Sequence, residues 1–122
     1  MSKKIKKILA KKNKTKIVSL TAYSKNIAKI LDKYCDIILV GDSMANVLYG
    51  MKNTNQITID NIIQHSISVS KGVKKSLLVV DMPRSTCKNL IQAKKNAKLI
   101  LKKTKCDAVK VESNNKNFNI IK

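Results

Sequence analysis

The sequence predicts an α/β fold in which short buried strands alternate with amphipathic helices. Three apolar runs each finish on an acid: IILVGD at 37–42, SLLVVD at 76–81 and AVKVE at 108–112. An apolar run that ends in polar groups is typical of a buried parallel strand that presents a ligand site at its C-terminal end. Strands that alternate with helices indicate parallel pairing through right-handed crossovers. A chain of 122 residues is long enough for one domain with a single core, so we expect one domain over 1–122.

The first elements are a helix, a strand and a second helix. A short amphipathic helix is expected over 3–12, and we expect it to cover an open end of the core rather than to lie on a membrane. The β-branched run at 16–23 predicts a first strand. Ser24 is a suitable N-cap for a helix over 25–34. The apolar stripe expected for this helix comprises Ile27, Ile30, Leu31 and Tyr34.

A second strand is expected over 36–40, and it ends in a Gly-Asp-Ser turn. From 44 to 57 the pattern is irregular and polar, which makes this stretch a candidate active-site loop. Thr58 is the next N-cap, and the helix that follows is expected to stop at Gly72.

The last elements are a strand, a helix and a strand. The third strand is expected over 76–81, and a proline shortly after it forbids its extension. A helix is expected to begin around Ser85 or Thr86 and to end near residue 103. The fourth strand is expected over 107–112, so the βα units extend from about 16 to 112.

Acids at the strand ends form the candidate site. Asp42, Asp81 and Glu112 would converge on one rim of a parallel sheet or barrel, where oxygen ligands can hold a hard cation such as Mg²⁺. Clustered carboxylates repel one another unless a cation or a proton intervenes, which favours a metal. Spacing alone is equally consistent with solvated turn residues. Asp36 and Asp107 open their strands, and we expect them on the opposite face, which serves stability.

Three polar residues near these acids have open roles. Lys110 should point to the same face as Glu112, and it needs a partner, either the acid cluster or an anionic ligand. Ser43 directly follows Asp42, and its hydroxyl or amide could bind a carboxylate, although a turn former is an equal alternative. His65 lies in the middle of a helix, where a structural role is favoured over a catalytic one.

The charge of the chain is strongly positive, with 26 basic and 7 acidic residues and a net charge of +19. Such a field attracts nucleic-acid phosphate of any sequence. Only Arg84 is an arginine, however, and four aromatic residues provide no stacking platform. We therefore interpret the lysines as a compositional bias and expect no specific nucleic-acid partner.

Cysteine usage and hydropathy indicate the compartment. Cys35, Cys87 and Cys106 are odd in number and lack a CxxC spacing, which disfavours a disulfide framework or a zinc site. No apolar run approaches 18 residues, and the basic N-terminus lacks the features of a secretory signal. We expect a cytoplasmic protein with no membrane partner.

Five segments together resemble the ketopantoate hydroxymethyltransferase family, also called 3-methyl-2-oxobutanoate hydroxymethyltransferase. They appear in that family's order and at about its spacing. The segments are TAYS at 21–24, ILVGDSM at 38–44, QITIDNIIQHS at 56–66, LLVVDMP at 77–83 and VKVE at 109–112.

The resemblance implies the N-terminal half of a (β/α)₈ TIM barrel of the phosphoenolpyruvate-binding type, with a leading helix. It implies hydroxymethyl transfer from 5,10-methylenetetrahydrofolate to the 2-oxo acid 3-methyl-2-oxobutanoate, which gives 2-dehydropantoate in pantothenate biosynthesis. By match, Asp42, Asp81 and Glu112 would surround Mg²⁺, and Asp42, Ser43, Asp81 and Lys110 would bind the 2-oxo acid.

The chain also departs from the family. The family's catalytic base is a glutamate of the C-terminal half, so no catalytic residue is expected in this chain, and 113–122 would be a truncated segment of an incomplete barrel. We therefore expect the chain alone to be inactive and to associate with a C-terminal half or, as in a full-length family member, with copies of itself. Two alternatives remain: another Mg²⁺-dependent 2-oxo acid lyase or mutase of the same superfamily, or a non-catalytic basic binding protein. Residues expected to lack part of their packing in a half-barrel are Ile38, Val40, Leu77, Val79 and Ala108.

Overall fold

The computed structural model describes residues 2–112 and Ile120. The segment expected at 113–122 therefore lies outside the described residues, apart from Ile120. In chain order the elements, with η for a 3₁₀ helix, are α1 (Lys3–Lys11), β1 (Ser19–Thr21), α2 (Lys25–Leu31), β2 (Ile37–Val40), α3 (Met44–Val47), η1 (Thr54–Gln56), α4 (Ile59–Ser70), β3 (Leu77–Asp81), η2 (Arg84–Thr86), α5 (Leu90–Thr104) and β4 (Ala108–Lys110).

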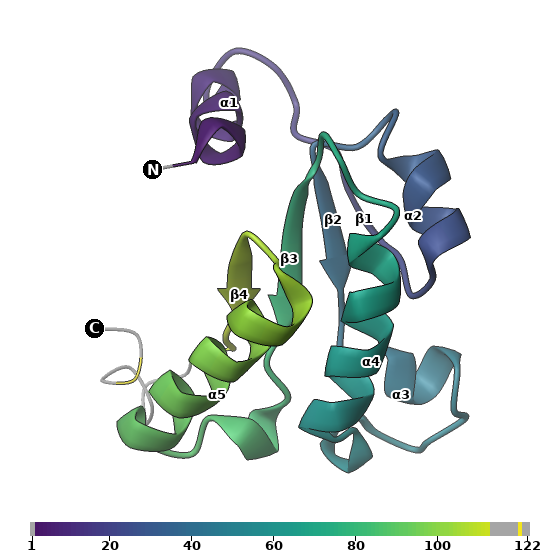
Figure 1. Cartoon of the computed structure of the whole chain (residues 1–122), viewed down its shortest axis with the longest axis vertical. Coiled ribbons are helices and arrows are strands. Elements are labelled where there is room, and N and C mark those ends of the chain that lie inside the picture. The colour runs from purple at the N-terminus through teal and green to yellow at the C-terminus, as the bar shows by residue number, and fades with distance from the viewer. Residues whose placement is uncertain (1, 113–119, 121–122) are drawn as a thin grey trace.

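The strands form one parallel sheet in the order β1-β2-β3-β4, and helices pack on it. Helix α4 contacts β2 and β3, and α5 contacts β4, so these two helices lie over the sheet side by side (Figure 1). This arrangement confirms the α/β class and the parallel pairing. Because all strands run the same way, their C-terminal ends meet at one edge, near α3 (Figure 1).

The helices cover one face of the sheet at β2 and β3, whereas the other face is partly open. Ile38 and Val40 are 0% exposed, because they pair with Leu78 and Val80 on the face that the helices cover. Leu77 is also buried, at 8% exposed, so the expectation of incomplete packing is wrong for these three residues. It is right for Val79 and Ala108, which are half-buried on the other face. In β2 the residues of that face are Ile37 and Leu39, because a shift of one position moves a strand residue to the opposite face.

Several elements differ from the bounds expected. Strand β1 covers Ser19–Thr21 where 16–23 was expected, α2 ends at Leu31 where 34 was expected, and β4 covers Ala108–Lys110 where 107–112 was expected.

The stretch at 44–57 is not wholly irregular, because it contains α3 and η1. The helix expected to begin around Ser85 or Thr86 begins at Leu90, since the chain first makes the turn η2. The Asn89 side chain then caps α5 by accepting a hydrogen bond from the Gln92 amide at 2.9 Å.

Most of the apolar stripe predicted for α2 does not face the core, although Leu31 packs against it. Ile27, Ile30 and Tyr34 are 50%, 57% and 74% exposed. Helix α2 instead packs on α4 through the side that carries Ala28, which is fully buried. Gly72 makes this close approach possible, because a Cβ there would lie 2.4 Å from the Lys25 carbonyl oxygen.

The leading helix α1 lies beyond the end of the sheet at which the strands begin (Figure 1). Lys4 binds Asp107 at 2.9 Å, and Lys11 binds Asp36 at 2.7 Å. The same carboxylates accept backbone N–H bonds from Leu78 and Val18. Asp36 and Asp107 thus stabilise the end opposite the candidate site, as predicted.

The three cysteines are free and buried, and burial raises the pKa of each thiol. Within residues 2–112, no helix has the length and apolar character needed to cross a membrane.

Candidate functional site

An ion pair between neighbouring strands occupies the centre of the candidate site. Asp81 ends β3 and pairs in register with Lys110, which ends β4, so both side chains lie on the same face of the sheet. Lys110 Nζ donates to Asp81 Oδ2 at 2.8 Å. Asp81 is 2% exposed, whereas Lys110 is half-buried. The partner that the sequence required for Lys110 is therefore the acid cluster.

Burial and charge act against each other at this pair. Burial raises the pKa of the Asp81 carboxyl above its ordinary value, and the hydrogen bond and positive charge of Lys110 oppose that rise. Burial also lowers the pKa of Lys110, but its contacts with Asp81 and Glu112 outweigh this effect and leave the pKa raised. Lys110 therefore keeps its proton and presents a positive charge at this edge of the sheet.

Glu112 and Asp42 join the cluster in different ways. Lys110 Nζ also donates to Glu112 Oε1 at 3.2 Å, and the Glu112 side chain is 68% exposed. Asp42 enters through its backbone, because its N–H donates to Asp81 Oδ2 at 3.3 Å. The structure thus brings together Asp81, Lys110 and Glu112, while Asp42 contributes its main chain.

One buried oxygen at this site has no protein partner. Among residues 2–112, Asp81 Oδ1 is buried and makes no hydrogen bond. An unsatisfied buried carboxylate oxygen is costly, and a hard cation is one group that can satisfy it. In the same part of the chain no three His, Cys, Asp or Glu side chains already form a metal-binding group. Asp81 Oδ1 is therefore the oxygen of this cluster that is open to a cation, while the Lys110 ammonium lies between the carboxylates of Asp81 and Glu112.

Ser43 lies beside Tyr23 at the same edge. The hydroxyls of Ser43 and Tyr23 are 2.8 Å apart and hydrogen-bonded. Ser43 precedes α3 but its side chain does not cap that helix, so its hydroxyl is held by Tyr23 alone among the described contacts. Gly41 leaves room for this contact, because a Cβ there would lie 3.1 Å from Ser43 Oγ.

The sequence did not assign a role to Tyr23 or Tyr49, and both contact His65. His65 Nδ1 lies 2.8 Å from the Tyr23 carbonyl oxygen, and Nε2 lies 2.9 Å from the Tyr49 hydroxyl. Tyr23 is the last residue of the first β-branched run, and this position could have marked it, as the end of a run marked Asp42 and Asp81. Tyr49 carries no such signal, because the loop conformation that brings it to His65 has no periodicity in the sequence.

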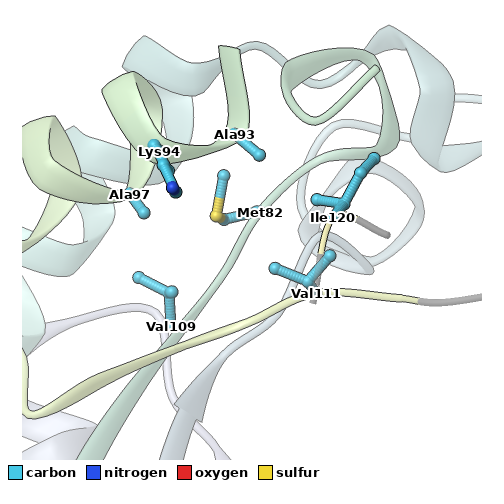
Figure 2. A pocket seen from close by; sticks show the side chains of 7 residues that line it. All are labelled: Met82, Ala93, Lys94, Ala97, Val109, Val111 and Ile120. Carbon is cyan, nitrogen blue, oxygen red and sulfur yellow. The ribbon is translucent and has the colours of Figure 1, made fainter. Parts of the chain in front are cut away.

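An apolar cavity of about 300 Å³ is separate from this site. It lies between α5 and β4 and is lined by Met82, Ala93, Lys94, Ala97, Val109, Val111 and Ile120 (Figure 2). Val109 and Val111 alternate with Lys110 along the chain, so they point to the opposite side from the ion pair.

The family model for ketopantoate hydroxymethyltransferase matches residues 2–122 of the chain. A protein of Pelagibacter ubique named 3-methyl-2-oxobutanoate hydroxymethyltransferase is 58% identical over 122 residues, which are the whole chain and 48% of that relative. Proteins of the same name from Anaplasma marginale and Brucella canis are 50% and 44% identical, over 86% of this chain and 38% of each relative. The chain therefore spans less than half the length of these curated relatives.

Proposed function

The chain belongs to the ketopantoate hydroxymethyltransferase family, and on that premise we propose that it carries the metal- and substrate-binding part of such an enzyme. The reaction moves a hydroxymethyl group from 5,10-methylenetetrahydrofolate to 3-methyl-2-oxobutanoate and gives 2-dehydropantoate for pantothenate biosynthesis. The family match does not favour the alternatives, a lyase or mutase and a non-catalytic basic protein.

We propose that the parallel sheet is part of a (β/α)₈ barrel of the phosphoenolpyruvate-binding type. Support comes from the four parallel strands in sequential order and from helices that cover one face. On the other face the side chains of Ile37, Leu39 and Val79 are half-buried. In a barrel, the residues of this face would point into the interior. In a barrel this face would be closed by further strands, either from a C-terminal half or from another copy of the chain.

The observation that carries the proposed site is the buried, unpartnered Asp81 Oδ1 beside a protonated Lys110. Asp81 would hold Mg²⁺, with Asp42 and Glu112 around it. Mg²⁺ held there would supply Lewis-acid polarisation of the keto group of the 2-oxo acid, which would make the C3 proton more acidic.

Binding of the substrate carboxylate would belong to the side chains of this chain. Lys110 would attract the substrate carboxylate, because its ammonium group keeps its proton and has one N–H donor left after binding Asp81 and Glu112. Ser43 would donate its hydroxyl proton to the same carboxylate and fix the orientation of the acid. The base that removes the C3 proton is proposed to lie in the C-terminal half, and we propose a cytoplasmic location for the enzyme.

Calorimetry of the chain with 3-methyl-2-oxobutanoate, with and without Mg²⁺, tests this proposal. We expect binding that requires Mg²⁺ and that Asp81→Asn abolishes. Asp60→Asn, which changes an exposed acid on α4, should leave the affinity unchanged. The absence of Mg²⁺-dependent binding in the unmodified chain, or equal affinity in Asp81→Asn, would reject the assignment.

A further inference from the structure

His65 connects three segments that surround the candidate site. It lies on α4 and is half-buried, and its two ring nitrogens reach the end of the first strand segment and the loop after α3. Its ring also meets the rings of Tyr23 and Tyr49 edge-on, with centroids 6.5 Å and 6.0 Å away. Edge-to-face contacts of this kind add to the hydrogen bonds in fixing ring orientation.

The hydrogen bonds of His65 determine where its proton lies. A backbone carbonyl oxygen can only accept, so Nδ1 must donate to the carbonyl of Tyr23. In the neutral imidazole, Nε2 then has a lone pair and accepts the hydroxyl proton of Tyr49. The geometry thus selects the tautomer protonated on Nδ1 and orients the Tyr49 hydroxyl.

The Tyr23 hydroxyl in turn determines the direction of the Ser43 proton. A serine hydroxyl carries one proton, so when Ser43 donates to a ligand carboxylate its oxygen must accept the bond from Tyr23. Tyr23 can hold this position only if its backbone and ring are fixed, and His65 contacts both. A chain of contacts therefore runs from Tyr49 through His65 and Tyr23 to Ser43.

We propose that His65 is a positioning residue that orients Ser43 for the substrate carboxylate and fastens the 44–57 loop through Tyr49. The proposal rests on the proposed function for the identity of the ligand, whereas the loop and the tautomer concern the protein alone. This role differs from a purely structural histidine, since its loss should act on the ligand through Ser43 and not through the fold.

Two variants separate the contacts, and a third serves as the control. His65→Phe keeps a ring and removes both hydrogen bonds, and Tyr49→Phe removes only the hydroxyl that binds Nε2. Tyr34→Phe is the matched control, because Tyr34 lies in the turn after α2 and is 74% exposed. We expect faster amide hydrogen exchange over 44–57 in His65→Phe and Tyr49→Phe, and no change in Tyr34→Phe.

Nitrogen-15 NMR of the unmodified chain should show His65 protonated on Nδ1 at a pH where the ring is neutral. An imidazole protonated on Nε2 would overturn the proposal, as would unchanged exchange of the loop in Tyr49→Phe. These two readouts need no ligand, so they decide the positioning role even if 3-methyl-2-oxobutanoate does not bind and the proposed function fails. They also remain informative if His65→Phe does not fold.

A double-mutant cycle tests the connection to Ser43. We expect His65→Phe to weaken Mg²⁺-dependent binding of 3-methyl-2-oxobutanoate about 5-fold, the effect of one lost neutral hydrogen bond. In a Ser43→Ala background the same change should have no further effect, because the two residues act through one contact. A full 5-fold loss in that background would show that His65 acts independently of Ser43 and would overturn the proposal.

Discussion

Asp32, Asp36 and Asp81 show how position decides the charge state of a carboxylate in this molecule. Burial alone would raise the pKa of Asp32, but backbone N–H groups of Ser76, Lys74 and Lys75 outweigh it and leave the pKa lowered. The hydrogen bond from Lys11 lowers the pKa of Asp36. At the other end of the sheet, burial raises the pKa of Asp81. The carboxylates of Asp32 and Asp36, which stabilise the fold, are therefore held in the charged form. At Asp81 the hydrogen bonds and the charge of Lys110 do not fully offset the effect of burial on the pKa.

The lowered pKa of Asp32 predicts acid sensitivity. A carboxyl whose pKa is lower in the folded state contributes stability above its unfolded pKa of about 4, and loses it as the pH falls through the folded value. Asp32→Asn should lower the unfolding free energy at pH 7 by about 2 kcal/mol, because charge-assisted bonds to three backbone amides are weakened.

Urea unfolding at a series of pH values checks this prediction. The difference between Asp32→Asn and the unmodified chain should shrink below pH 4 and stay constant from pH 5 to 8. Asp60→Asn, at an exposed position in the first turn of α4, should cost only about 0.5 kcal/mol. A difference that grows as the pH falls would contradict the sign of the effect.

At the residue scale, two simple rules predicted where Asp81 and Lys110 lie. Asp81 was expected at one edge of the sheet because it ends an apolar run, and Lys110 was expected on the face of Glu112 because strand side chains alternate. The register places Asp81 and Lys110 side by side. The sequence could not predict that Lys110 also binds Glu112, because this contact depends on side-chain length and conformation. In the structure Lys110 Nζ lies 3.2 Å from Glu112 Oε1. The hydrogen bond between Tyr23 and Ser43 joins residues 20 positions apart, and no rule of sequence spacing predicts it.

Helices α2 and α4 illustrate how one glycine sets the approach of two elements. A Cβ at position 72 would lie 2.4 Å from the Lys25 carbonyl oxygen and 2.9 Å from the Lys29 nitrogen. Both are backbone atoms of α2, so the clash could be relieved only by moving the helix. Helix α2 has only 7 residues. If it moved away from α4, few other contacts would therefore hold it in place.

Gly72→Ala is accordingly expected to lower the unfolding free energy by about 3 kcal/mol, the upper range for overpacking. Urea unfolding followed by circular dichroism provides the measurement. The matched change Gly50→Ala adds the same methyl group where nothing lies within 4 Å, and its positive φ of 62° should cost only about 1 kcal/mol. Equal losses in the two variants would show that backbone conformation, and not the α2–α4 contact, sets the cost.

At the element scale, caps and periodicity gave the order of helices and strands but not every boundary or face. Thr58 was predicted as an N-cap, and it forms a capping box with Asn61. The start of α5 was placed too early, since η2 occupies the residues that carry helix-start signals. Periodicity identified the apolar stripe of α2 without showing which neighbour covers it, and of its four residues Leu31 packs against the core.

The whole molecule carries a net charge of +19 that the candidate site does not use. We predict that any retention on DNA is non-specific and is lost by about 200 mM salt, because counterion release dominates such binding. Electrophoretic mobility shifts with unrelated duplexes of equal length, at several salt concentrations, provide the measurement. Sequence-selective binding that survives about 200 mM salt would contradict the compositional interpretation of the lysines.

The partly open sheet face and the exposed side of α2 are the surfaces at which the proposed barrel would be closed. Val79, Ala108 and Leu39 on the sheet, with Ile27 and Ile30 on α2, are apolar side chains only partly covered. Since the chain spans 48% of its Pelagibacter ubique relative, the remaining part of that relative contains enough residues to supply the other strands of a barrel. The same completion would bring the proposed base to Asp81 and Lys110.

Formation of 2-dehydropantoate tests this account most directly. The chain is mixed with the separately expressed C-terminal part of the Pelagibacter ubique relative, and product is measured with Mg²⁺, 5,10-methylenetetrahydrofolate and 3-methyl-2-oxobutanoate. The account predicts product from the mixture, none from either part alone, and none when the chain carries Asp81→Asn. Product at an unchanged rate with Asp81→Asn, or turnover by the unmodified chain alone, would contradict it.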